Sequence, residues 1–333
     1  MFRRFFLRWA PVLMAPLPLV AATERESLRY EATRQAMGTV FTVTAYGANQ
    51  TQLEAAVGAA LEEAARLDNL LSNYKPQSEW STVNRTAAER PVRVERELFD
   101  LLAKCRQYSQ QSEGTFDITV GPLMRSWGFF KGEGRFPHRA EVRVAMAGVG
   151  FENVRLNPAD QTVQFAHPAT EMDPGGIGKG YAVKKMVEIL REAGVKNAFV
   201  SAGGSSLYGL GTPPGKPGWE VKVSHPKYKN RDVAVVHLKN QAMATSGSAE
   251  KHFVASGEIY SHIMDPRTGF PAKGMLSVSL VAPDAMDVEA WAKPMYILGP
   301  QWAAQHKPKG MRVLFCPEGP KGQRWETTCE WLQ

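Results

Sequence analysis

Apolar residues recur every three or four positions between Leu53 and Leu71, which predicts an amphipathic helix of about five turns. The same spacing predicts a helix around residues 98–105 and another that opens at Gly175–Gly180 and ends at Gly194. Apolar and polar residues alternate over residues 40–46, a pattern typical of a half-buried strand. The chain is therefore expected to combine helices with strands.

The rest of the chain is expected to contain a loop, a last helix and several short strands. The polar segment 72–85, which contains Pro76, is expected to be a loop, and a helix is expected over Asp287–Leu298. Strands are expected at residues 154–156, 162–165, 197–201, 219–223, 233–238, 259–264, 276–281 and 311–315. Because helices and strands mix without a regular βαβ alternation, the pattern favours an α+β fold, with mixed sheets and packed helices, over a doubly wound sheet. No linker divides the chain, so residues 23–333 are expected to form a single domain.

The first 22 residues have the composition of an export signal. Arg3 and Arg4 begin a short basic segment, and residues 9–22 carry no charge and end in small side chains. The paired arginines favour the twin-arginine route. The alternative is an uncleaved membrane-tethering helix, but the apolar segment is shorter than the roughly 20 residues needed to span a bilayer and contains three prolines. The protein is therefore expected to be exported, to the periplasm or the outer face of the inner membrane.

The charge balance does not indicate a nucleic-acid partner. The formal net charge is +7, and removal of the first 22 residues takes away three arginines and no acid, which leaves +4. No cluster of lysine and arginine interleaved with aromatic residues is present, so nucleic-acid binding has no support.

Three cysteines are present, and their spacing matches no zinc or redox motif. A disulfide between Cys316 and Cys329 could form in an oxidising compartment and would leave Cys105 free. All three are expected to be structural.

A glycine-rich segment, residues 173–180, leads directly into the predicted third helix. Glycines let the backbone approach a ligand closely, and the unpaired N–H groups of a helix N-terminus favour a phosphate. The spacing around Lys179 matches neither a P-loop nor the dinucleotide fingerprint. A tight loop–helix junction without a ligand is the alternative interpretation.

Two further segments carry groups that could act in catalysis. His262 follows a predicted strand and precedes Asp265, and such a histidine can accept a proton near neutral pH or serve only as a structural residue. The carboxylates of Asp284, Asp287 and Glu289 cluster before the last predicted helix. They could hold magnesium beside a phosphate, or they could be a solvated helix start.

Eight short motifs follow one another over roughly residues 36 to 300. They are Met37-Gly38-Thr39, Ser72-Asn73-Tyr74 with Ser78-Glu79 and Asn84, residues 113–117, residues 121–129, residues 173–181, Gly203-Gly204, Thr245-Ser246-Gly247 and residues 262–269. Their order resembles that of the ApbE-type FAD:protein FMN transferases. Eight motifs in the same order make the resemblance far more specific than any one of them.

The resemblance implies a T-fold-like α+β architecture that holds FAD in a cleft, with Mg²⁺ at the pyrophosphate. Enzymes of this type cleave FAD, release AMP and attach FMN through a phosphoester to a threonine of an exported partner, typically a subunit of a membrane electron-transfer complex. Residues 23–333 would then be an FAD-binding flavin transferase domain.

The resemblance also implies roles for individual residues. His262 would be the base that takes the proton of the acceptor hydroxyl. Glu289, Asp287 and the backbone carbonyl near Gly176 would hold the metal. FAD would be bound by Met37, Ser72, Tyr74, Asp117, Gly175, Gly176, Lys179, Thr245, Ser246, Asp265 and Arg267.

The sequence departs from the family pattern where the metal is expected. The family carries an aspartate and, four residues later, a threonine, and the corresponding residues here are Glu289 and Lys293. If Asp287 is aligned instead, the fourth residue is Trp291, so neither alignment restores a hydroxyl. Lys293 would either pair with Glu289 and the pyrophosphate or turn to solvent and leave a weakened metal site.

Further departures concern helix geometry and charge. Pro294 inside the last predicted helix removes a backbone hydrogen bond. Lys184 and Ser205 stand where the family carries aspartate, and Ala249 where it carries tyrosine. Two alternatives to the transferase therefore stay open: an FAD-binding protein with impaired catalysis, and an FAD pyrophosphatase that releases FMN and AMP.

Overall fold

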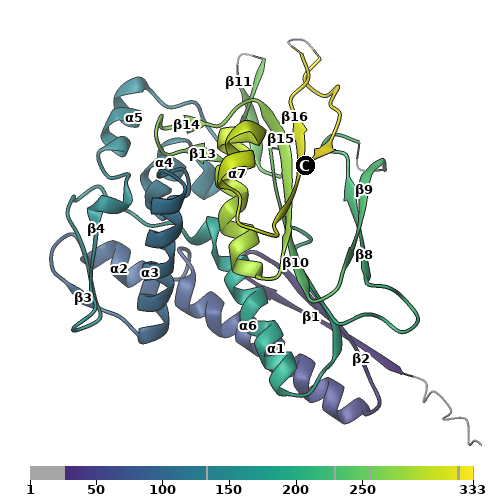
Figure 1. The fold of residues 1–333 in the computed structure, drawn as a ribbon. Coiled ribbons are helices and arrows are strands. Elements are labelled where there is room, and N and C mark those ends of the chain that lie inside the picture. The colour runs from purple at the N-terminus through teal and green to yellow at the C-terminus, as the bar shows by residue number, and fades with distance from the viewer. Residues whose placement is uncertain are drawn as a thin grey trace, which may run out of the picture.

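A long antiparallel sheet runs through the centre of the computed structural model (Figure 1). The structure describes residues 27–132, 134–228, 230–248, 250–255, 257–320 and 323–332, so the predicted export signal lies outside the described residues. Within them the sheet has eight strands in the order β1-β2-β6-β7-β10-β15-β16-β17. The strands are β1 (Leu28–Ala36), β2 (Thr39–Gly47), β6 (Asn197–Ala202), β7 (Ser206–Leu210), β10 (Gln241–Gly247), β15 (Met275–Ala282), β16 (Arg312–Pro317) and β17 (Glu330–Trp331).

Three helices cover one face of this sheet: α1 (Gln50–Leu71), α6 (Gly178–Glu192) and α7 (Ala285–His306) (Figure 1). Asn49 caps α1 by accepting a hydrogen bond from the backbone N–H of Gln52 at 3.0 Å. The apolar side chains of α1, spaced as predicted, are buried against β1, β2 and α6.

The opposite face of the sheet is covered by a hairpin of β8 (Trp219–Ser224) and β9 (Asp232–Leu238). Successive residues of β15 alternate between the two faces: Leu280 packs in the core under the helices and Val281 packs against the hairpin. Because both faces are covered, all eight residues of β15 are buried, including Ser277 and Ser279.

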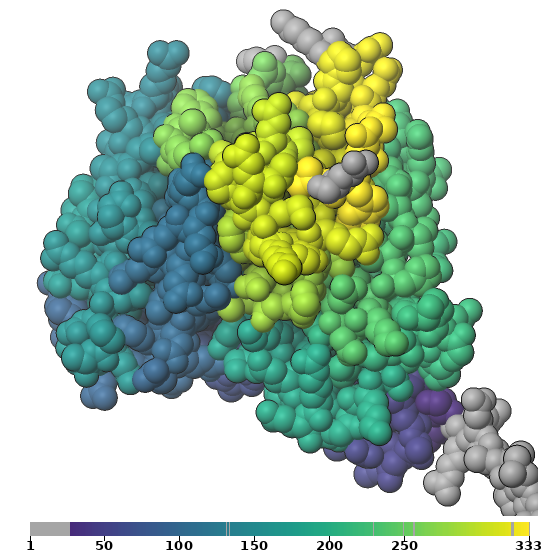
Figure 2. All heavy atoms as spheres, viewed as in Figure 1, coloured from purple at the N-terminus to yellow at the C-terminus, as the bar shows by residue number. Residues whose placement is uncertain are grey.

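The remaining helices form a lobe beside α7. In Figure 2, α3 lies directly against α7, where the hydroxyl of Tyr108 donates to the carboxylate of Asp287. The lobe consists of α2 (Glu79–Thr86), α3 (Arg96–Gln111), α4 (Gly121–Ser126), α5 (Arg139–Met146) and a small sheet of β3 (Val92–Arg93), β5 (Thr162–Phe165) and β4 (Val154–Asn157). Two short hairpins complete the described fold, β11 (His252–Ala255) with β12 (Glu258–Ser261) and β13 (Met264–Asp265) with β14 (Phe270–Pro271).

The α+β prediction is confirmed, and three local predictions need correction. The segment 72–85 is not wholly a loop, because Ser78 caps a helix by accepting from the backbone N–H of Ser81 at 2.9 Å, and Trp80 and Val83 are buried one turn apart. Pro76 precedes this helix and does not interrupt it.

The predicted strand at 259–264 is two strands with His262 between them. The backbone N–H of His262 extends the β11–β12 pairing by one residue and donates to the carbonyl of Lys251 at 3.0 Å. The last helix extends beyond its predicted end to His306, with Pro294 inside it and a break at Gly299, where φ is +77°.

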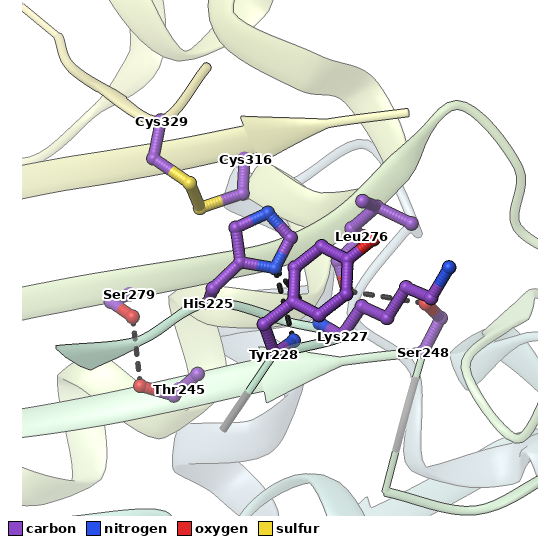
Figure 3. The surroundings of a disulfide bond; sticks show 9 residues. All are labelled: His225, Lys227, Tyr228, Thr245, Ser248, Leu276, Ser279, Cys316 and Cys329. Atoms are coloured by element: carbon purple, nitrogen blue, oxygen red, sulfur yellow. Dashed lines mark hydrogen bonds between the residues drawn. A yellow bond between two sulfur atoms is a disulfide. The ribbon is translucent and has the colours of Figure 1, made fainter. Parts of the chain in front are cut away.

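A disulfide joins Cys316 at the end of β16 to Cys329 near β17 (Figure 3). It connects the C-terminal segment to the central sheet, while Cys105 is free and buried. Among the described residues, no helix has both the length and the apolar character that crossing a membrane requires.

Gly180 allows α6 and α7 to approach closely. A side-chain carbon at this position would overlap the carbonyl oxygen of Ala285 and lie 2.6 Å from the carboxylate of Glu289. We expect Gly180→Ala to lower the free energy of unfolding by about 1–3 kcal/mol, the usual cost of overpacking. Urea unfolding followed by circular dichroism measures the change.

Gly58→Ala is the matched control. Gly58 is exposed in α1 with open space around it, so alanine there should raise the free energy of unfolding by about 0.5–1 kcal/mol. Equal effects of the two substitutions would contradict the packing argument.

Candidate functional site

The segment that precedes α6 is held in place by the lobe. The side chain of Asn84 in α2 accepts from the N–H of Met172 at 2.8 Å and donates to its carbonyl at 2.9 Å. The indole of Trp80 donates to the same carbonyl at 3.0 Å. The carboxylate of Asp173 then accepts from the N–H of Gly175 at 2.7 Å, and burial raises the pKa of this carboxyl. These contacts fix the direction in which the glycine-rich segment enters α6.

A narrow cavity of about 30 Å³ lies where this segment meets β10 and α7. The cavity has room for water-sized groups, so it can contact part of a ligand but not enclose a dinucleotide. Its walls come from the predicted phosphate segment, the central sheet, the histidine segment and the last helix. The lining residues are Gly175, Lys179, Ser205, Ser206, Ala244, Thr245, Ser246, Glu250, His262, Glu289 and Lys293. The structure therefore brings together Gly175, Lys179, Thr245, Ser246, His262 and Glu289 from the predicted set.

The cationic side chains in the cavity come from two helices. The ammonium of Lys179, in the first turn of α6, donates to the hydroxyl of Ser205 at 2.6 Å. Lys293 extends from α7 towards Gly176, where a side-chain carbon would lie 3.8 Å from the Cε atom of Lys293. Burial lowers the pKa of Lys293, the carboxylate of Glu289 opposes this, and the nearby charge of Lys179 lowers it further. Lys293 therefore faces the cavity and does not turn to solvent.

Glu289 is buried, with 2% of its surface exposed. Its carboxylate accepts the backbone N–H of Gly180, one of the N–H groups that the first turn of α6 leaves unpaired. Among the described residues Lys293 and Glu289 form no ion pair, and the contact of this carboxylate is the one that its Oε2 atom makes with Gly180. The cavity thus combines two ammonium groups with one buried carboxylate.

His262 is oriented by a backbone contact. Its Nδ1 atom lies 3.1 Å from the carbonyl oxygen of Lys251. A carbonyl only accepts hydrogen bonds, so Nδ1 carries the proton and Nε2 keeps a lone pair. Burial lowers the pKa of His262 to about 4; the Lys251 contact opposes the shift, and the charges of Lys293, Lys251 and Lys179 add to it. At neutral pH the imidazole is therefore uncharged and able to accept a proton.

The hydroxyl groups on the opposite wall belong to β10. Thr245 and Ser279 share a hydrogen bond of 2.8 Å between their hydroxyls, across the β10–β15 pairing (Figure 3). Ser246 is the next residue and also lines the cavity. Both predicted FAD-binding residues on this strand thus lie beside His262 and the two lysines.

Tyr74 lies outside the cavity on an exposed aromatic surface. Its ring is 67% exposed and stacks on Phe130, with 4.8 Å between the ring centroids. The guanidinium of Arg125 lies 4.1 Å from the centroid of Phe130. The preceding residue, Asn73, donates from its side chain to the carboxylate of Asp173 at 3.1 Å, which places Tyr74 close to the glycine-rich segment. A flat aromatic ring of a ligand could stack on this surface.

Met37 occupies a two-residue turn between β1 and β2. Met37 and Gly38 both have positive φ, +51° and +69°, as a type I′ turn requires. The adjacent Thr39 side chain lies against Gly203, and Gly203 is two residues before Ser205, the partner of Lys179. The turn is therefore connected to the cavity through Gly203–Ser205.

The remaining predicted residues have partners outside the cavity. Ser72 caps α1 and accepts from the N–H of Tyr74 at 3.2 Å. Asp117 accepts from the N–H and hydroxyl of Thr119, both at 2.7 Å, and burial raises its pKa to about 6. Asp265 and Arg267 form an ion pair with each other at 2.8 Å in the turn after His262.

Asp287, predicted as a metal ligand, accepts from the hydroxyl of Tyr108 and does not line the cavity. Its carboxylate therefore links α7 to α3 through this hydrogen bond.

The residues present at the cavity do not fit a divalent cation. Two ammonium groups would repel the ion, and one of the two carboxylate oxygens of Glu289 already accepts the N–H of Gly180. Magnesium requires six oxygen ligands in near-ideal geometry, and within the part of the chain that the structure describes no group of three or more histidine, cysteine or acidic side chains is placed to hold a metal.

Four residues that surround the site were not predicted. Ser206 and Glu250 line the cavity, Lys251 orients His262, and Phe130 supports Tyr74. Phe130 follows directly after a motif, which could have indicated it. The position of Lys251 depends on the pairing of β11 with β12, which the sequence pattern did not predict.

We expect the imidazole of His262 to titrate near pH 4, below the ordinary value of about 6.5, because burial and three lysines disfavour its charged form. Replacing Lys293 with methionine removes one of these charges and should raise the His262 pKa. NMR titration of the imidazole resonances in both proteins measures it. A wild-type value near 6.5, or no rise in the variant, would show that the cavity does not control His262.

Comparison with known proteins places the chain among flavin-handling proteins. The FAD:protein FMN transferase of Klebsiella pneumoniae (strain 342) is 29% identical over 297 residues, which cover 87% of this chain and 85% of that protein. That of Treponema pallidum (strain Nichols) is 30% identical over 289 residues, 81% and 79% of the two chains.

Solved structures agree in fold. The crystal structure of the ApbE protein from Thermotoga maritima superposes with a TM-score of 0.82 at 29% identity, covering 91% of this chain and 96% of that one. The apo flavinyl transferase ApbE from Pseudomonas stutzeri gives a TM-score of 0.77 at 25% identity, covering 91% and 95%. The model of the ApbE family matches residues 37–315. The chain therefore belongs to the ApbE family.

Proposed function

We propose that the protein is an FAD:protein FMN transferase, which moves FMN from FAD to a hydroxyl of a protein acceptor and releases AMP. The name that its relatives carry supports this activity. The observation that carries the proposal is the cavity itself, in which the lone pair of a neutral His262 faces the same small space as Lys179, Lys293 and the glycine-rich start of α6.

The chemistry uses the Nε2 atom of His262 as a general base. The acceptor oxygen forms a bond to the phosphorus of the FMN half, and the bond from that phosphorus to the bridging oxygen breaks. AMP leaves with the bridging oxygen, and the hydroxyl proton passes to Nε2 of His262. The pKa of His262, lowered to about 4, keeps the base unprotonated at neutral pH before the acceptor binds.

The negative charge of the pyrophosphate is met by the cavity. Lys179 and Lys293 supply positive charge, and the first turn of α6 supplies backbone N–H groups. Such fixed positive groups stabilise the charge that moves onto the leaving phosphate during the transfer. We assign no step to Mg²⁺, because Lys293 lies beside Gly176 and Asp287 is held by Tyr108.

We propose further that the protein acts outside the cytoplasm and that its acceptor is exported. Residues 1–22 support export by their sequence, and the Cys316–Cys329 disulfide supports an oxidising compartment. By resemblance to the family, the acceptor would be a threonine of a subunit of a membrane electron-transfer complex.

The protein should bind FAD more tightly than FMN. The positive cavity can interact with both phosphates of FAD but with only one in FMN, and Tyr74 offers a surface for a ring. Isothermal titration calorimetry with both flavins measures the difference. Equal affinity for the two, or binding of neither, would contradict the flavin assignment.

His262→Asn should reduce FMN transfer by roughly 10²-fold or more, the usual contribution of a general base, while FAD affinity changes only a few-fold. In-gel flavin fluorescence after incubation with FAD and a candidate acceptor measures transfer. His237→Asn is the matched control, because His237 is exposed on β9 and does not line the cavity.

Full activity of His262→Asn would show that His262 is only structural. Release of free FMN and AMP in the presence of the acceptor would indicate a pyrophosphatase instead.

A further inference from the structure

Lys293 is held in a position that needs a functional explanation. Its side chain extends from α7 towards the glycine-rich segment, is largely buried there and lines the cavity. Among the residues that the structure describes, no hydrogen bond or ion pair involves its ammonium. The neighbouring lysines are different, since Lys179 donates to Ser205 and Lys184 pairs with Asp284 at 2.6 Å. An ammonium that lines a cavity without a partner of its own is available to an anion, so Lys293 is expected to meet an anion from outside the chain.

We propose that the ammonium of Lys293 supplies, together with Lys179, the positive charge that a divalent cation would otherwise supply at the pyrophosphate of FAD. FAD binding and FMN transfer then proceed without a divalent cation. This inference rests on the proposed function and deepens it, because it assigns the pyrophosphate to named side chains.

The charges in the cavity favour this assignment over a weakened metal site. The pyrophosphate of FAD carries two negative charges, and Lys179 and Lys293 carry two positive ones. A divalent cation added to the cavity would instead face the two ammonium groups together with the carboxylates of Glu250 and Glu289, and one oxygen of Glu289 already accepts the N–H of Gly180. The two ammonium groups therefore match the pyrophosphate in charge, whereas the lining as a whole, two lysines with Glu289 and Glu250, carries no excess negative charge that would attract a metal ion.

Lys293 also lies beside the groups whose charge would change during FMN transfer. During transfer the acceptor proton passes to His262, and the phosphate of the leaving AMP gains one negative charge as the bond to the bridging oxygen breaks. The charge of Lys293 acts directly on His262, whose pKa it lowers. Lys293 is thus close to the proton acceptor and to the cavity that would hold the phosphates, and no oxidant or other reactant is needed.

The test measures binding by isothermal titration calorimetry in EDTA and in millimolar Mg²⁺. The ligands are FAD and inorganic pyrophosphate, and the proteins are the wild type, Lys293→Met and Lys222→Met. Lys222 is exposed on β8, and its replacement removes the same charge far from the cavity lining. We expect the wild type and Lys222→Met to bind FAD in EDTA as in Mg²⁺, within about two-fold. Lys293→Met should bind both ligands roughly 10- to 100-fold more weakly in EDTA.

Thermal unfolding provides a second measurement that does not depend on flavin. If the ammonium of Lys293 has no partner until an anion binds, methionine in its place should raise the melting temperature of the ligand-free protein. An unpaired charge is then replaced by an apolar side chain of similar length. A lower melting temperature would indicate a structural partner for Lys293 and would overturn the inference.

The binding results separate the inference from the proposed function. A wild-type FAD affinity that rises more than ten-fold with Mg²⁺, or a Lys293→Met variant that binds as the wild type does in EDTA, would overturn the role of Lys293 while FMN transfer remained. Absence of FAD binding in both buffers would overturn the proposed function, and this inference with it.

Discussion

The backbone N–H of Gly180 donates to the buried carboxylate of Glu289, and this contact joins the first turn of α6 to the first half of α7. It requires glycine at position 180, because a side-chain carbon would overlap both Ala285 and Glu289. Once the two helices are held together, the glycine-rich segment before α6 faces the residue one turn beyond Glu289 on α7, which is Lys293. The position of the cation therefore follows from a contact between a carboxylate and a backbone amide.

The same arrangement explains the state of His262. Lys293, Lys251 and Lys179 face the imidazole, and their charges together with burial keep it neutral. An anion in the cavity would offset these charges and raise the proton affinity of Nε2. Binding of a pyrophosphate would thus strengthen the base that the reaction needs, whereas in the free protein the base is prevented from becoming charged. The same lysines would thus bind the anionic ligand and lower the pKa of His262.

The long helices, most strands and the grouping of His262 with the glycine-rich segment could be predicted from the sequence, because they depend on local periodicity and on motif order. Other features depend on contacts between distant residues. Tyr108 and Asp287 are 179 residues apart, and nothing near Asp287 indicates that its carboxylate is occupied by a hydroxyl from α3. The same holds for Lys179 and Ser205, where the hydroxyl lies in the turn after β6. Helix α2 begins at Ser78 and Glu79, which are good starting residues, but Pro76 just before them is typical of a loop and conceals it in the sequence.

Three of the departures that the family resemblance implies share one direction. At position 184 a lysine replaces an expected acid, at position 205 a serine replaces another, and at position 293 a lysine replaces a hydroxyl. Each change makes the region around the start of α6 more positive. The charge of Lys184 is neutralised by an ion pair with Asp284, which also caps α7. Ser205 accepts a hydrogen bond from Lys179 without neutralising its charge, as an aspartate there would. Of the side chains that line the cavity, Lys179 and Lys293 are thus the lysines without a compensating carboxylate of their own, and they can meet a pyrophosphate with ammonium groups beside Glu289 and Glu250.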